Sequence, residues 1–151
     1  MTEWVRNNPD QVKAEEPDKV QIEKFYGVAV RELGDARSVI SPEGRLTHAY
    51  TACLGIASAA LLVLGYRVRN SRGHHYKRIE SLEHTIGFDH DDVRRIQTYR
   101  TDRHESMYEI ASKVSEAKAD HALQTAESLL ESFKSWILEN SPELAPPSIG
   151  S

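Results

Sequence analysis

Two arginines, a histidine and a tyrosine recur within one short stretch of the sequence at the spacing of a helix face. Arg100, His104 and Tyr108 are each four residues apart, and Arg103 lies beside them. Residues four apart are neighbours on a helix surface. Guanidinium groups pair with phosphate oxygens, and an aromatic ring stacks on a base. These four residues therefore predict a face that binds phosphate or a nucleotide.

The same two arginines interrupt the apolar face of a helix expected from about residue 89 to residue 112. Apolar residues recur along it at three- and four-residue steps, and positions 100 and 103 continue those steps: Val93, Ile96, Met107, Ile110 and Val114. An unpaired guanidinium is costly to bury because it does not lose its proton. Three outcomes are open. The arginines pair with a carboxylate (Glu32, Glu80 or Glu83), extend to the surface, or line a polar cleft.

A second basic segment joins two expected helices at one end of the bundle. It contains five cationic residues and no acid: Arg67, Arg69, Arg72, Lys77 and Arg78. His74 and His75 lie among them. We expect Arg67, Arg69, His74 and His75 to bind substrate as a second wall of the cleft, the alternative being an ordinary solvated face. Adjacent histidines lack the three- or four-residue spacing of metal ligands on a helix, so no metal is expected.

The remaining pattern is helical. Apolar periods predict helices over 17–40, 45–69, 89–112 and from 115 to about 139, with a short helix before Gly87 that directs Tyr76, Ile79, Leu82 and Ile86 inward. No alternating strand pattern is found. We expect an all-α, up-and-down bundle of about five helices over residues 17–140, between a flexible arm (1–16) and a flexible tail (141–151). Trp4 is expected to pin the arm to the bundle.

Bulk properties exclude several classes of protein. The chain has 151 residues, a net charge of −4 and one cysteine, Cys53, which excludes a disulfide framework. The N-terminal residues lack the apolar core of a signal peptide. The apolar stretch over 49–66 includes polar residues and two glycines, so it predicts a buried helix and no membrane contact. A cytoplasmic protein is expected.

Four short segments resemble the HEPN superfamily of small helical domains. They are Gly65-Tyr66-Arg67, Gly73-His74-His75-Tyr76, Ile79-Glu80-Ser81-Leu82, and the run from Tyr99 to Tyr108. The resemblance covers residues 20–140. It implies either a metal-independent endoribonuclease that acts as a homodimer, or a non-catalytic partner of a nucleotidyltransferase in a toxin–antitoxin system. It implies no cofactor.

The resemblance also suggests roles for individual residues. Arg103 matches the family's motif arginine, and His104 matches the polar residue after it. The motif histidine is expected at positions 108–110, where Tyr108, Glu109 and Ile110 stand instead. Tyrosine, with a pKa near 10, is a poor base at neutral pH, which leaves His104 as the acid or base.

The predicted catalytic set is therefore Arg103, His104 and Tyr108, with Arg100 binding substrate. The leading hypothesis is a HEPN-like domain that binds RNA or a nucleotide, with endoribonuclease activity as its catalytic form and a degenerate active site. The alternatives are a non-catalytic partner protein and a structural scaffold.

Overall fold

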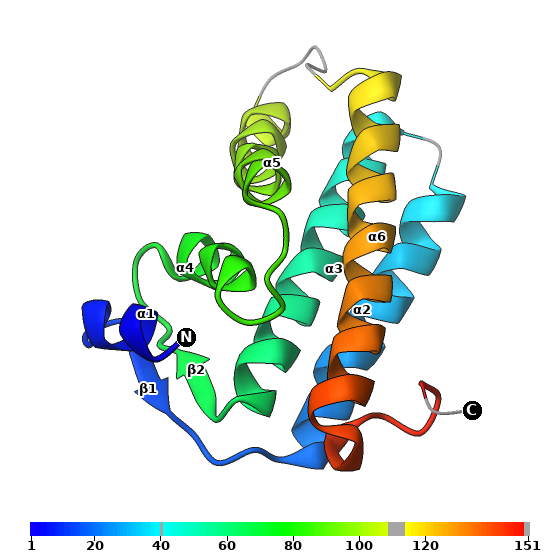
Figure 1. Cartoon of the computed structure of the whole chain (residues 1–151). Coiled ribbons are helices and arrows are strands. Elements are labelled where there is room, and N and C mark those ends of the chain that lie inside the picture. Colours follow the sequence, from blue (N-terminus) through cyan, green and yellow to red (C-terminus); the bar gives the residue numbers. More distant parts are fainter. Residues whose placement is uncertain (40, 109–113, 150–151) are drawn as a thin grey trace.

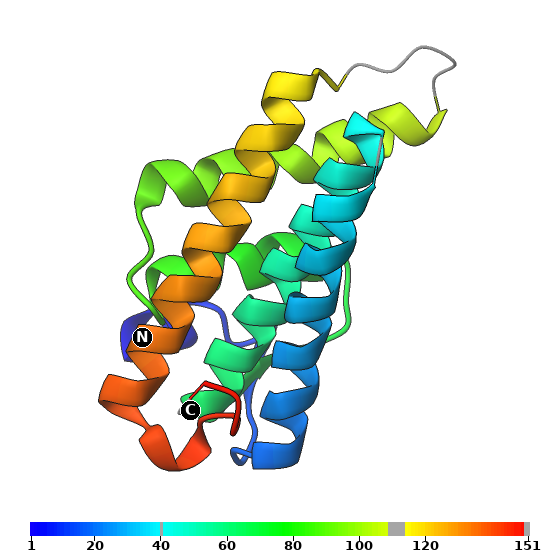
Figure 2. The same ribbon diagram turned by 90° about the vertical axis from the view of Figure 1, so that its right-hand side faces the viewer.

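A computed structural model describes residues 1–39, 41–108 and 114–149, and for residues 101–108 it describes the helical backbone alone. Most of the chain is helical, with about five main helices packed together, as the sequence predicts, and a small two-stranded sheet. Figures 1 and 2 show α2, α3 and α6 lying side by side, with α5 crossing them steeply.

The first long helices form a hairpin. Helix α2 (Lys19–Ser38) begins where Asp18 accepts a hydrogen bond from the backbone nitrogen of Val20. Helix α3 (Pro42–Val63) begins where Ser41 accepts one from the backbone nitrogen of Gly44. Such side-chain caps satisfy amide groups that have no partner within the helix. The short connection makes the two helices antiparallel neighbours, with α6 (Glu116–Asn140) packed against both.

Helix α3 is the centre of the molecule. It is buried nearly all round, against α2, α4, α5 and α6. Its length and hydropathy would also suit a membrane span, but 72% of its apolar window is buried inside the structure. This burial agrees with the predicted core helix. Its small residues permit close packing: a Cβ atom added to Gly55 would lie 3.0 Å from the carbonyl oxygen of Phe25 on α2.

The remaining helices cover one side of α3. They are α4 (His74–Glu80), the 3₁₀ turn η1 (Ser81–Glu83) and α5 (His90–Tyr108). Gly87 follows η1 with a φ of 76°, a left-handed conformation that glycine adopts without strain. Asp89 then accepts a hydrogen bond from the backbone nitrogen of Asp92 at the start of α5. This cap agrees with the predicted start of a helix at about residue 89.

The N-terminal residues, which the sequence predicts as a flexible arm, have regular secondary structure. They form α1 (Thr2–Asn7) and β1 (Val12–Ala14), and β1 pairs antiparallel with β2 (Tyr66–Val68). Trp4 is 6% exposed and packs with Val12, Leu61 and Val68, so it does anchor this segment. The helix expected over 45–69 ends at residue 63. The two short strands are a small addition to the predicted helical fold.

The C-terminal residues also differ from the expected loose tail. They form the 3₁₀ turn η2 (Pro142–Leu144), Ala145 is buried, and Ile149 packs against the core. Pro146 and Pro147 line a groove together with Tyr26 of α2. The proline content of the tail indicates an unfolded segment. In the structure, however, this segment folds back along α2.

Candidate anion-binding site

Two arginines meet where β2 turns into α4. Gly65, with a φ of 89°, turns the chain from α3 into β2, and Gly73, with a φ of 79°, turns it into α4. Arg67 of β2 and Arg78 of α4 line the same small cavity of about 40 Å³. This volume holds a water molecule but not a base or a sugar. A ligand held by these arginines would therefore be bound from the surface.

The Arg78 guanidinium is half-buried and poorly compensated. Its Nη2 donates a hydrogen bond to Oδ1 of Asn70 at 3.1 Å, and no carboxylate among the described residues pairs with it. Burial lowers the pKa of Arg78, and the positive charge of Arg67 lowers it further. Arginine stays charged under all ordinary conditions, so this site retains a cation that lacks an anionic partner.

Arg67 is better compensated than Arg78. Its Nη1 lies 3.4 Å from Oε2 of Glu15, just after β1. Glu15, Glu16 and Asp18 also line a groove beside Arg67 on the side toward α2. The carboxylates are thus gathered near Arg67, whereas Arg78 faces the histidines of α4. An incoming anion would be attracted most strongly to the Arg78 side of the cavity.

His74 and His75 stand next to Arg78 at the start of α4. Their ring centroids are 4.2 Å apart, and the His75 ring contacts the ring of buried Tyr50 edge-on at 6.5 Å. Burial lowers the pKa of His74, and the Arg78 charge lowers it further. Nδ1 of His74 is buried without a hydrogen-bond partner among the described residues. A neutral imidazole with a vacant ring nitrogen can accept or donate one hydrogen bond.

We call this group of five residues the basic junction: Arg67, Asn70, His74, His75 and Arg78. It carries two guanidinium charges, and among the described residues Glu15 pairs with one of them, that of Arg67. Arginine matches the oxygens of phosphate and carboxylate ligands with paired N–H donors. The chemistry available here is therefore the binding of an oxyanion, with the imidazole of His74 beside it.

The other basic residues of the segment are arranged differently. Arg69 and Arg72 are exposed to solvent. Lys77 is tied down, because its Nζ donates to Oε1 of Glu80 at 2.9 Å and to Oδ1 of Asn8 at 2.8 Å. The structure thus brings together Arg67, His74 and His75 of the predicted substrate-binding residues. It does not place the side chain of Arg69 in that group.

The apolar stripe of α5 differs from its predicted course. Val93 and Ile96 are buried as expected, but the next inward residue is Tyr99, which is 2% exposed. Its hydroxyl lies 3.2 Å from Nδ1 of His121 on α6. Arg100 is exposed, so its charge remains solvated and its prediction as part of the buried stripe is wrong. Of the three outcomes open for Arg100, the structure shows extension to the surface.

The predicted catalytic residues lie outside the described side chains. Arg103, His104 and Tyr108 belong to the part of α5 for which the structure describes the backbone alone. Earlier on the same helix, Nε2 of Gln97 donates to the carbonyl oxygen of Tyr76 on α4 at 2.9 Å, so α5 contacts α4 there. The Tyr76 ring itself is 46% exposed, which corrects the expectation that it points inward.

Sequence reasoning missed Arg78 and Asn70 as site residues. Arg78 is one of five basic residues of its segment, and its charge alone does not distinguish it from Arg72 or Lys77. Its position four residues after His74 on a helix was the available signal. Asn70 lies outside any helix and has no spacing that would indicate its contact.

Comparison of the chain with known proteins finds no matching family model and no matching curated protein.

Proposed function

We propose that this protein binds RNA or a nucleotide, holding a phosphate group at the basic junction. The observation that carries the proposal is the Arg78 guanidinium, half-buried beside Arg67, with Asn70 as its hydrogen-bond partner and no carboxylate partner among the described residues. A buried charge without a counter-ion is costly, and a phosphate dianion would offset that cost. The resemblance to HEPN domains supports the same class of ligand.

The surrounding residues suit a ligand larger than phosphate alone. Tyr76 presents an exposed ring on α4. Two exposed cations, Arg69 and Arg72, lie in the segment between β2 and α4, and a third, Arg100, lies on α5. Stacking on aromatic rings and charge attraction to the backbone are the two usual contributions to single-stranded RNA binding. Single-stranded RNA is therefore the first ligand to test, ahead of free nucleotides.

The test is fluorescence anisotropy with a short labelled single-stranded RNA, in EDTA and at several salt concentrations. We expect binding that weakens as salt increases, because phosphate contacts release counter-ions. Arg78→Gln is expected to weaken binding by about tenfold or more, the size of one lost charged hydrogen bond. Unlabelled nucleotide and inorganic phosphate, added as competitors, distinguish recognition of RNA from recognition of phosphate.

Arg37→Gln is the matched control. Arg37 is an exposed arginine whose Nε lies 3.3 Å from Oε1 of Glu127, between α2 and α6. The Arg37→Gln variant loses the same charge on the other side of α3. Its RNA affinity should therefore stay close to that of the wild type. Absence of salt-sensitive binding by the wild-type chain, or equal losses in Arg78→Gln and Arg37→Gln, would contradict the proposal.

Endoribonuclease activity is the catalytic form of the same proposal. Incubation of labelled RNA in EDTA should then give cleavage that is lost in Arg103→Ala and in His104→Ala. Cleavage that survives both substitutions would contradict the roles of these residues. Binding without any cleavage would contradict the catalytic form and leave phosphate binding at the basic junction in place.

A further inference from the structure

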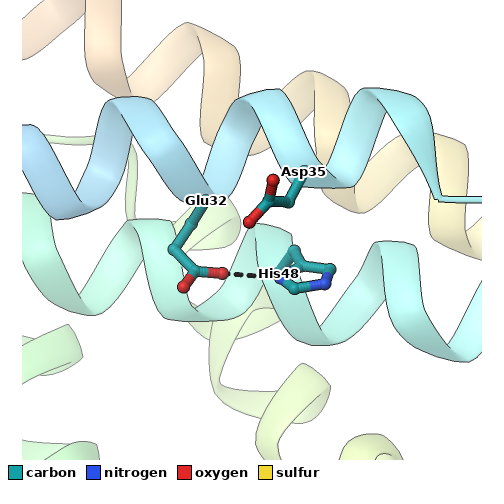
Figure 3. A group of neighbouring side chains, drawn as sticks. All are labelled: Glu32, Asp35 and His48. Atoms are coloured by element: carbon teal, nitrogen blue, oxygen red, sulfur yellow. Dashed lines mark hydrogen bonds and ion pairs between the residues drawn. The ribbon is translucent and has the colours of Figure 1, made fainter.

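Three side chains with metal-binding atoms gather between α2 and α3, at the end of the hairpin near its connection. Glu32 and Asp35 are three positions apart on α2, and His48 lies on α3. The potential donor atoms of the three residues all lie within 4.8 Å of one another. Figure 3 shows the Asp35 carboxylate beside the hydrogen-bonded pair of Glu32 and His48.

The hairpin brings these residues together. Residues three apart lie on one face of a helix, so the two carboxylates of α2 project to the same side. The antiparallel course of α3 then places His48 opposite them. Nδ1 of His48 lies 2.6 Å from Oε2 of Glu32. The sequence alone indicates no such group, because the histidine is on another helix and its register against α2 depends on the packing.

The three donor residues differ in their exposure to solvent. Glu32 and His48 have side chains that are 17% and 32% exposed, whereas Asp35 is exposed. An ion could therefore enter from solvent past Asp35. The two partly buried donors are restricted in their rotamers by the packing of the helices, which reduces the entropy lost when a ligand is bound.

The charges favour a cation. Two carboxylates stand one helical turn apart, and within the described ranges no lysine or arginine pairs with either of them. With a neutral imidazole the group carries two negative charges. A divalent ion would neutralise both, whereas a protonated His48 compensates one.

We propose that Glu32, Asp35 and His48 bind a divalent transition-metal ion of the zinc class. Zn²⁺ takes imidazole nitrogen and carboxylate oxygen at about 2.0–2.2 Å in tetrahedral geometry, which puts the donor atoms roughly 3.3–3.6 Å apart. The observed spacing, from 2.6 Å to at most 4.8 Å, brackets that separation.

The donor set also determines the type of ion and its coordination. Magnesium and calcium prefer all-oxygen ligands, so an imidazole in the set favours zinc or a similar transition metal. Three protein ligands leave the fourth position to water, as in zinc sites that remain open to solvent. This site is separate from the basic junction and does not depend on RNA binding.

A second histidine–glutamate pair provides the matched control. Nδ1 of His90 lies 2.6 Å from Oε1 of Glu83, the same distance as in the pair of His48 and Glu32. Among the described residues, however, no third donor completes a group around His90. If His48 and Glu32 form only an ion pair, they should bind Zn²⁺ no better than His90 and Glu83 do.

The test is isothermal titration of the full chain, stripped with EDTA, with Zn²⁺ alone and then with Mg²⁺. We expect one Zn²⁺ per chain and no competition by Mg²⁺. His48→Ala and Asp35→Asn should each weaken Zn²⁺ binding by about tenfold or more, since removal of a ligand costs at least as much as loss of a supporting contact. His90→Ala should bind Zn²⁺ as the wild type does.

Thermal unfolding gives an independent readout. Zn²⁺ should raise the Tm of the wild type and of His90→Ala, but not that of Asp35→Asn, whose exposed side chain can change without loss of the fold. Three results would overturn the proposal: no Zn²⁺ binding by the wild type, unchanged binding in His48→Ala, or binding that His74→Ala removes and His48→Ala leaves intact.

Discussion

The indole Nε1 of Trp4 donates a hydrogen bond to Oε1 of Glu80 at 2.8 Å, across 76 positions of the sequence. The Trp4 ring also stacks on His84 with centroids 5.6 Å apart. Lys77 donates to the same Glu80 oxygen and to Asn8. The N-terminal segment is therefore fixed to α4, the helix that carries both histidines of the basic junction.

Loss of the Trp4 side chain should destabilise the protein. Trp4→Ala removes a buried ring and leaves a cavity among Val12, Leu61 and Val68, so we expect the free energy of unfolding to fall by about 3 kcal/mol. Urea denaturation followed by circular dichroism measures this change. Arg6→Ala, on the exposed face of the same short helix, should change stability by less than about 0.5 kcal/mol. Similar losses in the two variants would show that α1 is not anchored through Trp4.

The close approach of α2 and α3 should make Gly55 intolerant of a larger residue. A Cβ atom there would already lie 3.0 Å from the Phe25 carbonyl oxygen, so Gly55→Val forces the helices apart. We expect a loss of about 1–3 kcal/mol in the free energy of unfolding.

Gly34 is the matched control within the same helix pair. A Cβ atom at Gly34 would meet nothing within 4 Å, and this glycine lies inside α2. Gly34→Ala should therefore raise stability by about 0.5–1 kcal/mol through helix propensity alone. A stabilising Gly55→Val would show that the backbones of α2 and α3 are farther apart than described.

The thiol of Cys53 should be inert in the folded protein. Burial in α3 raises the pKa of Cys53 to about 12, so almost no thiolate exists at neutral or mildly alkaline pH. We expect no modification by an alkylating reagent in native buffer and full modification in denaturant, measured by mass spectrometry. Rapid native labelling would mean that α3 is open to solvent at this position.

The protein should lose stability on mild acidification, partly through His74. Because burial and Arg78 lower its pKa in the folded state, the unfolded chain binds the proton more readily. The free energy of unfolding should therefore fall as the pH drops from about 6.5, the ordinary histidine pKa, to the lower folded value. His74→Gln should reduce this slope, measured by denaturation at several pH values. A slope that is unchanged by the substitution would contradict the perturbed titration of His74.

Much of the helical framework could be predicted because its signals are local. The helices predicted to begin at 17 and at 115 begin within two residues of those positions, where Asp18 and Ser115 accept capping hydrogen bonds. The burial of α3 follows from its composition. Each of these inferences depends on residues within one or two turns of one another, where side-chain chemistry determines the outcome directly.

The stripe of α5 shows where periodicity becomes ambiguous. After Ile96, both position 99 and position 100 continue a helical apolar face, since a period of 3.6 permits a step of three or four. Packing determines which of the two positions faces inward. The Tyr99 ring is buried in the core, and its hydroxyl reaches His121 on α6. A tyrosine followed by an arginine is better interpreted with the aromatic residue inward.

The two strands, the basic junction and the group of Glu32, Asp35 and His48 could not be predicted, for a different reason. Each strand has three residues, too few for an alternating pattern, and they are brought together by the course of α2 and α3. The contact between Arg67 and Arg78, and that between Glu32 and His48, likewise depend on which residues face each other across elements. The sequence indicates a basic segment that contains Arg67 and Arg78. It gives no indication of the contact between Glu32 and His48.

The pairing of β1 with β2 has a consequence for the order of assembly. It joins two strands that α2 and α3 separate in the sequence, so β1 cannot complete its hydrogen bonds until the α2–α3 hairpin has been made. Contacts between distant residues form late because loop closure must precede them. Pulse-labelling hydrogen exchange should thus detect protection of α2 and α3 before protection of the Glu15 and Arg69 amides, which donate to the carbonyl oxygens of Gly65 and Gln11 across the strand pair. On a ribosome, β1 would remain unpaired, with Trp4 still in water, until β2 leaves the tunnel more than fifty residues later.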